Sequence, residues 1–344
     1  MKEMPLSERF ERFALTECKG NSRLYEFLSL QVSAADDLLE LSSHCRRGQP
    51  IPNLFFASIH YLLLKGVHHE LKAYYPDLVA SPLSVDQSFG AFRDFCHRYR
   101  EDIVAILQTR IVQTNEIRRC TYLYPSFCSI HNITRKPLSL IEIGTSAGLQ
   151  LLWDKFKYAY GSPEVYGDQE SPVQLVARLK NDVIPPLSRT SPPVAFRAGI
   201  DLHVINLSDD DDYLWLKALI WPEHVERRRW FEQAAEMMKR CNDVQLIEGD
   251  GLTVLPEVVT QIPEDSTLCV FHTHVANQFT ICEKEKLVQI LRDISFQRPV
   301  FHLFNNLYDA GKLHLALVHQ GVERDHIVAE IDGHGQWFAW LANV

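Results

Sequence analysis

The sequence predicts an α/β protein in which a helical N-terminal domain precedes a mostly parallel sheet. Apolar residues recur at helical spacing up to about residue 136, and five β-prone runs alternate with helical stretches after residue 137. The first of these runs ends in a glycine-bearing loop. We therefore expect a helical domain at 1–136 and a sheet domain at 137–344.

The N-terminal domain is predicted from two apolar stripes at helical spacing. They comprise Leu54, Phe55, Ile59, Leu62 and Leu63, and then Val104, Leu107 and Ile111. Asn115 continues the second stripe, although a buried amide without partners costs about 1–3 kcal/mol. Either neighbours such as Thr109, Gln113 or Glu116 satisfy this amide, or a ligand does. The domain is then either a lid over an active site or one side of a buried polar network.

Residues 138–149 predict a strand, a tight glycine turn and a helix. The apolar run Leu138–Ile143 contains Glu142, the loop runs from Gly144 through Thr145, Ser146 and Ala147 to Gly148, and a helical pattern starts at Leu149. Two interpretations exist. The loop is a nucleotide-binding turn with serine at its middle glycine, or it is the Gly-x-Ser-x-Gly elbow of a serine hydrolase.

The position of the loop favours the nucleotide-binding interpretation. A hydrolase elbow follows several strands, whereas only helical sequence precedes this one. Glu142, two residues before the first glycine, would have no catalytic or structural role in a hydrolase elbow. In a nucleoside-binding loop it accepts hydrogen bonds from the ligand or orients the loop amides.

The rest of the chain supplies further strands and one interruption. β-prone runs lie at 194–201, 244–249, 267–272 and 299–304, with helical stretches at 213–240 and 284–294. Asp209–Asp212 suit the N-terminus of the helix at 213, and Trp221-Pro222 should end or break it. The proline-rich segment 160–193 predicts an insertion with one short helix at 173–180. Residues 326–331 and 336–341 predict an antiparallel hairpin that closes the sheet.

Composition excludes several classes of function. The chain has 344 residues, 46% of them hydrophobic, and a net charge of −9, with no basic block that would suit nucleic acid. No run of about 20 apolar residues predicts a membrane span. The eight cysteines form no Cys-x-x-Cys pair, and the N-terminus lacks a secretory signal, so we expect a cytoplasmic protein without a zinc knuckle.

The segment Ile141–Gly148 resembles the first motif of class I S-adenosylmethionine-dependent methyltransferases, which are Rossmann-like. The strand ending at Asp201 resembles their second strand, whose acid holds the ribose, and Val244–Gly251 resembles the third. The whole chain also resembles an uncharacterised bacterial family, a domain of unknown function with a methyltransferase-like fold. The segments that carry this likeness are 109–116, 141–153, 199–202, 219–222 and 270–272.

The methyltransferase resemblance implies a cofactor site for S-adenosylmethionine. The residues it implies are Glu142, Gly144, Thr145, Ser146, Gly148, Asp201, Asp250 and Gly251. Asp201 follows Gly148 by more residues than is usual in a nucleotide-binding unit, and the insertion accounts for this. Asp168 lies at the usual distance of about 20 residues and competes for the ribose, although capping of the helix expected after Pro172 is its simpler role.

We expect the protein to transfer a methyl group to a small molecule. We expect no metal site, because the histidines are not accompanied by a third ligand at a spacing typical of zinc sites. The proton acceptor is expected among His272, His274 and Glu116. The two histidines alternate on a strand end, so at most one should face the site. Asn115 and either Arg110 or Arg119 are candidates for holding the substrate, since a guanidinium suits an anion. Two alternatives stay open: a nucleoside-binding module without catalysis, and a serine hydrolase that uses Ser146 with one of the histidines.

Overall fold

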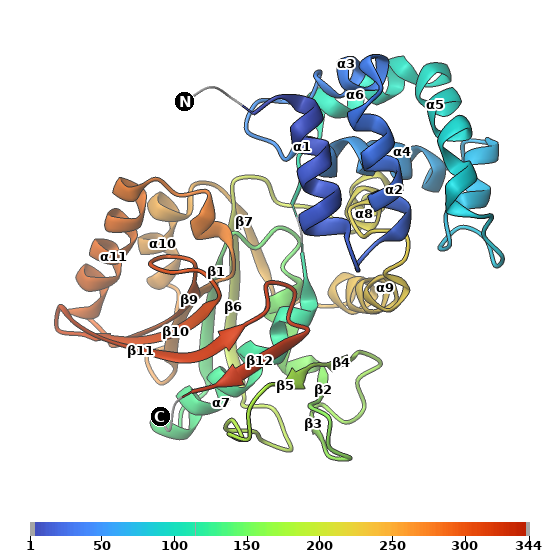
Figure 1. The fold of residues 1–344 in the computed structure, drawn as a ribbon. Coiled ribbons are helices and arrows are strands. Elements are labelled where there is room, and N and C mark those ends of the chain that lie inside the picture. The colour runs from blue at the N-terminus through green and yellow to red at the C-terminus, as the bar shows by residue number, and fades with distance from the viewer. Residues whose placement is uncertain (1–3, 114, 342–344) are drawn as a thin grey trace. The chain divides into compact units, whose positions relative to one another are not determined.

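The computed structural model describes residues 4–113 and 115–341 (Figure 1). Its contacts divide the chain into two compact units. Unit 1 comprises Met1–Thr114 and Ser208–Arg229, and unit 2 comprises Asn115–Leu207 and Trp230–Val344. These boundaries differ from the expected division near residue 136, because residues 115–136 pack with the sheet and a later segment joins the helical unit.

Unit 1 contains helices and turns but no strand among its described residues. Its helices are α1 (Leu6–Phe13), α2 (Arg23–Ser33), α3 (Asp36–Ser42), α4 (Ile51–Leu64), α5 (Ser88–Arg98), α6 (Arg100–Thr109) and α8 (Asp210–Ala218), with shorter turns at η1 (Ala14–Cys18), η2 (Glu70–Tyr74) and η3 (Val85–Gln87). Helix α4 is central to the core, which explains why its apolar stripe was so plain in the sequence. The stripe residue Ile111, in contrast, lies beyond the end of α6.

The helix expected at 213–240 is two helices. α8 ends at Ala218, and α9 runs over Val225–Lys239. Trp221 and Pro222 lie between them, as the sequence indicated, and the Trp221 ring packs edge-on against Phe13 and Tyr25. The Asp209 carboxylate caps α8 by accepting hydrogen bonds from the amides of Asp211 and Asp212.

Unit 2 is built on a large, mostly parallel sheet. Its order is β5-β12-β11-β10-β9-β8-β1-β6-β7. The parallel strands are β1 (Leu138–Ile143), β6 (Val194–Asp201), β7 (Gln245–Glu248), β8 (Thr267–His272) and β9 (Val300–Asn305). They match the five expected runs, and β1 is the middle one of these five strands, between β8 and β6.

Antiparallel strands extend the sheet beyond β9. They are β10 (Lys312–His319), β11 (Val322–Ile331) and β12 (Trp337–Trp340). The expected terminal hairpin is confirmed as β11 and β12. β10 was not predicted from the sequence; it is mostly buried and pairs with both β9 and β11.

The insertion is made of strands, and the helix expected at 173–180 is wrong. β2 (Lys157–Ala159), β3 (Val165–Gly167) and β4 (Gln174–Val176) form a small second sheet, and β5 (Arg178–Leu179) pairs with β12. Burial alternates from Val173 to Arg178, which is the period of a strand and not of a helix.

The remaining helices of unit 2 cover both faces of the sheet. α10 (Gly251–Val259) and α11 (Ile281–Ser295) pack on Ile141, Ile143 and Val270. α7 (Cys120–Thr134) lies on the opposite face, because its Phe127 contacts Phe271, which alternates with Val270. Short turns η4 (Ile117–Arg119), η5 (Leu149–Lys155) and η6 (Val275–Asn277) complete the unit.

The helix expected from Leu149 is the seven-residue 3₁₀ turn η5. Its first five residues are all buried, so it has no solvent-facing side. The periodicity of Leu149, Leu151 and Leu152 reflected a segment crossing the core rather than an amphipathic α-helix. The dipole of a long helix is therefore absent at the end of the loop.

Candidate functional site

The central candidate site lies in unit 2, at the carboxyl end of β1. Successive strands add to one side of β1 as β6 and β7, and then the chain returns to the other side as β8 and β9. In open α/β sheets, ligands bind in the crevice created where the strand order reverses in this way. The loop Gly144–Gly148 leaves β1 at this point.

Three residues of the loop have left-handed backbone conformations. The φ angles are 77° at Gly144, 53° at Ser146 and 74° at Gly148. A Cβ atom on Gly144 would lie 2.7 Å from the Val275 Cβ, and one on Gly148 would lie 2.8 Å from the Leu246 Cδ2. Both glycines are thus required by the turn and by packing within unit 2.

Glu142 is a buried carboxyl group at the base of the loop. Its side chain is only 2% exposed, and Thr145 Oγ1 donates a hydrogen bond of 2.6 Å to Glu142 Oε2. Burial raises the pKa of Glu142 to about 8, although the Thr145 hydrogen bond opposes the rise. The neighbouring β6 makes room through Gly199, where a Cβ would lie 2.4 Å from Thr145 Oγ1.

Asp201 and Asn115 hold the loop from two sides. Asp201 Oδ2 accepts a hydrogen bond of 2.7 Å from the Ser146 amide, and its Oδ1 accepts one of 3.0 Å from the His203 amide. Asn115 Nδ2 donates to the Thr145 carbonyl oxygen at 3.0 Å. The polar residue that interrupted an apolar stripe is therefore a contact of the loop itself.

Two other acids implicated by the sequence have local structural roles. Asp250 caps α10, accepting from the Leu252 amide and the Thr253 hydroxyl, and Gly251 packs on Ile143. Asp168 Oδ1 accepts from the Glu170 amide in a turn of the insertion. The expectation that Asp168 caps a helix is wrong, because strand β4 follows it.

The two candidate histidines lie in different surroundings. His272 is the last residue of β8 and is completely buried against the rings of His302 and Phe304. Burial lowers the pKa of His272 to about 3. His274 lies beyond the strand with a φ of 65°, and burial together with the nearby charge of Arg119 lowers its pKa to about 3 as well.

A polar network lies around His274 and includes Glu116 and Arg119. Arg119 Nη1 donates to Thr273 Oγ1 at 3.3 Å, and the Gln150 amide hydrogen-bonds the same hydroxyl at 3.1 Å. Glu116 Oε2 lies 3.8 Å from His334 Nδ1 in the turn between β11 and β12. Glu116, Arg119 and His274 are thus brought together, whereas His272 is buried in a separate cluster of rings.

Four polar residues of this network were not predicted from the sequence: Gln150, Thr273, Asn305 and Asn306. Asn305 Oδ1 accepts a hydrogen bond from the His274 amide at 2.7 Å, and Asn306 Nδ2 donates to His274 Nδ1 at 3.2 Å. A signal existed for the two asparagines, because they directly follow an apolar strand run, as polar residues do after β1. Nothing comparable marked Gln150, which lies within an apolar segment.

Arg110 belongs to the other unit. There its Nη1 forms an ion pair of 2.7 Å with Asp212 Oδ1, and its guanidinium lies 5.9 Å from the centroid of the Trp215 ring. Of the two arginines considered for an anionic substrate, only Arg119 lies in the unit that contains the loop.

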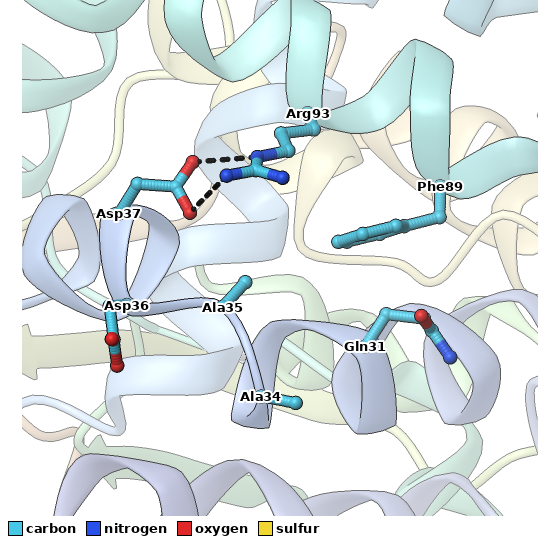
Figure 2. A pocket seen from close by; sticks show the side chains of 7 residues that line it. All are labelled: Gln31, Ala34, Ala35, Asp36, Asp37, Phe89 and Arg93. Atoms are coloured by element: carbon cyan, nitrogen blue, oxygen red, sulfur yellow. Dashed lines mark hydrogen bonds and ion pairs between the residues drawn. The ribbon is translucent and has the colours of Figure 1, made fainter.

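Unit 1 also carries an open surface hollow between α2, α3 and α5. Figure 2 shows Arg93 and Asp37 joined across it by hydrogen bonds of 2.9 and 3.1 Å. His97 also donates toward Asp37 at 2.7 Å. Because these charges already compensate each other, the hollow is a weaker candidate than the polar residues around the loop.

Comparisons with known proteins place the chain in a family. None of the described helices has the length and apolar character needed to cross a membrane. Neither curated proteins nor solved structures gave a significant match. A family model matches residues 7–340, and the chain therefore belongs to the family described as uncharacterized proteins conserved in bacteria (DUF2332).

Proposed function

We propose that unit 2 is a Rossmann-like domain that binds S-adenosylmethionine, and that the protein transfers the methyl group to a small molecule. The observation that carries the proposal is Glu142. It is a buried carboxyl group beside a glycine loop at the switch point of the sheet, and among the described residues no cation forms an ion pair with it. A ligand with a positive charge would supply the missing partner.

The residues present fit this cofactor. Glu142 would face a cationic group, either the ammonium or the sulfonium. Asp201 holds the loop through the Ser146 and His203 amides, and at this strand end its carboxylate would accept hydrogen bonds from ribose hydroxyls. Ser146 Oγ is buried without a hydrogen-bond partner among the described residues and offers a further contact.

In this reaction the protein would mainly position the substrate and the cofactor and accept a proton from the substrate. When bound, the cofactor supplies a methyl group on a positively charged sulfur, which is already electrophilic. We assign the proton to Glu116 rather than to His274. Burial keeps His274 neutral, with a pKa of about 3, and its Nδ1 already accepts a hydrogen bond from Asn306. Arg119 and Asn115 would position the substrate and the loop.

The alternatives fare less well in the same geometry. A serine hydrolase needs a hydrogen bond between its nucleophile and a histidine, and no described histidine bonds Ser146 Oγ. A nucleoside-binding module without catalysis uses the same loop and differs only in turnover. The experiment must therefore measure binding and methyl transfer separately.

Titration calorimetry of the full chain with S-adenosylmethionine and S-adenosylhomocysteine tests the proposal. We expect saturable binding, and we expect Glu142→Gln to weaken it by about 10- to 100-fold, since hydrogen bonds to charged groups contribute about 1.5–3 kcal/mol. Asp168→Asn is the matched control and should bind as the wild type does. Absence of binding at millimolar ligand rejects the proposal.

Catalysis is tested by incubating the protein with methyl-labelled S-adenosylmethionine and a bacterial small-molecule extract. We expect label in a small molecule, and Glu116→Gln should suppress transfer while it leaves cofactor affinity unchanged. Binding without transfer would favour the non-catalytic module. Labelling of Ser146 by a fluorophosphonate would instead support the hydrolase.

A further inference from the structure

Arg119 is a buried cation that forms no ion pair among the described residues, although its charge acts on the nearby Glu142 carboxyl group and opposes the rise in the pKa of Glu142. Its side chain is 7% exposed, and its Nε and Nη1 donate to the neutral oxygens of Gly333 and Thr273 at 2.9 and 3.3 Å. Within residues 4–113 and 115–341, no carboxylate forms an ion pair with it. Buried charges are normally paired, because desolvation of an isolated ion is costly.

Two unused hydrogen-bond donors lie in the same network. Asn305 is completely buried, its Oδ1 accepts from the His274 amide, and its Nδ2 has no partner among the described residues. His274 Nδ1 accepts from Asn306, so the ring proton is on Nε2, which is also buried and unpartnered. A polar group left in this way costs about 1–3 kcal/mol.

Asn305 contacts His274 directly, and Arg119 is linked to His274 through Thr273 and Gly333. Arg119 Nε donates to the Gly333 carbonyl, and a Cβ on Gly333 would lie 3.3 Å from the His274 ring. Arg119 also bonds Thr273, the residue before His274, and Asn305 holds the His274 backbone. His274 is kept in a left-handed conformation, a strained arrangement typical of functional sites.

We propose that Arg119, His274 and Asn305 bind a carboxylate group of a ligand at the carboxyl ends of β8 and β9. A guanidinium and two neutral N–H donors match the two oxygens and the single charge of a carboxylate. A dianionic phosphate suits the site less well, because Glu116 belongs to the same segment as Arg119 and Glu142 lies near it. The anion site stands on its own geometry, and only the identity of the ligand rests on the proposed function.

The carboxylate has two sources within the proposed function, the cofactor and the methyl acceptor. The first arm of the test compares S-adenosylmethionine with its decarboxylated analogue on the full chain. If the cofactor supplies the carboxylate, the analogue binds at least tenfold more weakly, and Arg119→Gln removes that difference. If the acceptor supplies it, the two bind equally and Arg119→Gln changes neither.

The second arm uses simple carboxylates and does not depend on the cofactor. Acetate and malonate should raise the melting temperature of the wild-type protein relative to chloride at equal ionic strength. Arg119→Gln should abolish this increase, whereas Arg118→Gln should retain it. Arg118 is the matched control, because it carries the same charge one residue away and instead lies over the Trp230 ring.

Asn305→Asp keeps the test decisive if Arg119→Gln does not fold. It replaces the unused Nδ2 donor by a carboxylate oxygen and keeps the oxygen that accepts from the His274 amide, so added carboxylates should no longer stabilise the protein. Carboxylate stabilisation that persists in both variants, or its absence from the wild type in both arms, overturns the proposal. Failure of S-adenosylmethionine to bind, with acetate stabilisation intact, rejects the proposed function alone.

Discussion

At the scale of single residues, the protonation state of Glu142 gives a direct test of cofactor binding. With a pKa of about 8, this carboxyl group is mostly protonated at pH 7. A cationic ligand favours the ionised form and lowers the pKa, so binding should release a proton. Calorimetric titrations in two buffers with different ionisation enthalpies measure this release.

We expect up to one proton released per bound S-adenosylmethionine at pH 7, and none in Glu142→Gln. Release should decline above pH 8, because the free protein has then already lost that proton. Equal proton release by the wild type and by Glu142→Gln would show that another group is responsible.

His272 and His302 form a buried pair with a predictable effect on acid stability. Neither ring has a hydrogen-bond partner among the described residues, and burial lowers the pKa of both. Because the pKa of each ring is lower in the folded protein than in the unfolded chain, the neutral rings make their full contribution to folding stability above about pH 6.5. It is lost as the pH falls through this value toward the folded-state pKa, which for His272 is about 3.

His272→Phe should therefore stabilise the protein by about 1–3 kcal/mol at neutral pH, because it removes unsatisfied polar atoms beside the Phe304 ring. The gain should increase below pH 6 and is measured by urea unfolding across pH 4–8. His319→Gln, at an exposed position, is the control. A gain that does not change with pH would contradict the assignment of a neutral ring.

At the scale of elements, one buried cluster ties together several helices of unit 1. His60 of α4 hydrogen-bonds Asp77 at 3.0 Å and the Ala218 carbonyl of α8 at 3.0 Å, while Arg228 of α9 forms an ion pair with the same carboxylate. Burial disfavours ionisation of Asp77, but His60 and Arg228 together hold its pKa below the ordinary value.

Asp77→Ala should destabilise unit 1 by about 3–5 kcal/mol, because it leaves Arg228 buried without its partner. Asp94→Ala removes the ion pair between His69 and the exposed Asp94 carboxylate, and it should change the free energy of unfolding much less. Urea unfolding followed by tryptophan fluorescence gives both values. Equal losses in the two variants would contradict a special role for the buried cluster.

The sequence predicted elements best where one local pattern decided the structure. The five parallel strands and the Trp221-Pro222 break followed from apolar runs and from proline. The expected helices at 149 and 173–180 were wrong, because buried leucines and alternating burial depend on what surrounds the chain. β10 was not predicted, since the histidine within its apolar run obscured the strand pattern.

Prediction of the site was limited in a similar way. Glu142, Asp201 and Asn115 were found because each follows or interrupts an apolar pattern, and the structure brings all three to the loop. Contacts such as those of Arg119 with Thr273 and Gly333 depend on the order of strands in the sheet. No local spacing encodes that order, so the sequence indicated Arg119 as a residue that could hold an anion but not the neighbours that surround it.

At the scale of the whole molecule, the helical unit is discontinuous in sequence. Its second part contributes α8, whose Trp215 and Ala218 belong to the core around α4. The indole N–H of Trp215 also donates to the Ile111 carbonyl at 2.8 Å. An N-terminal fragment that stops at residue 113 therefore lacks part of its own core.

We expect the 1–113 fragment to lose fixed tertiary packing, seen as a lost near-ultraviolet dichroism signal with residual helical signal in the far ultraviolet. Adding a peptide of residues 208–229 should restore the near-ultraviolet signal. A 1–113 fragment that unfolds cooperatively on its own would show that α8 is dispensable. A single boundary near residue 136 was expected because the change from helices to strands is local in the sequence, whereas the contribution of residues 208–229 to unit 1 is not.

The pairing of β5 with β12 cannot form until the end of the chain has been synthesised. Leu179 lies opposite Phe338, and the Arg178 amide donates to the Gln336 carbonyl at 3.0 Å. At synthesis rates of about 5–20 residues per second, the partner of β5 leaves the ribosome roughly 10–30 s after β5 itself. The edge of β5 that pairs with β12 stays uncovered through that interval, when unpaired strand edges are prone to aggregation.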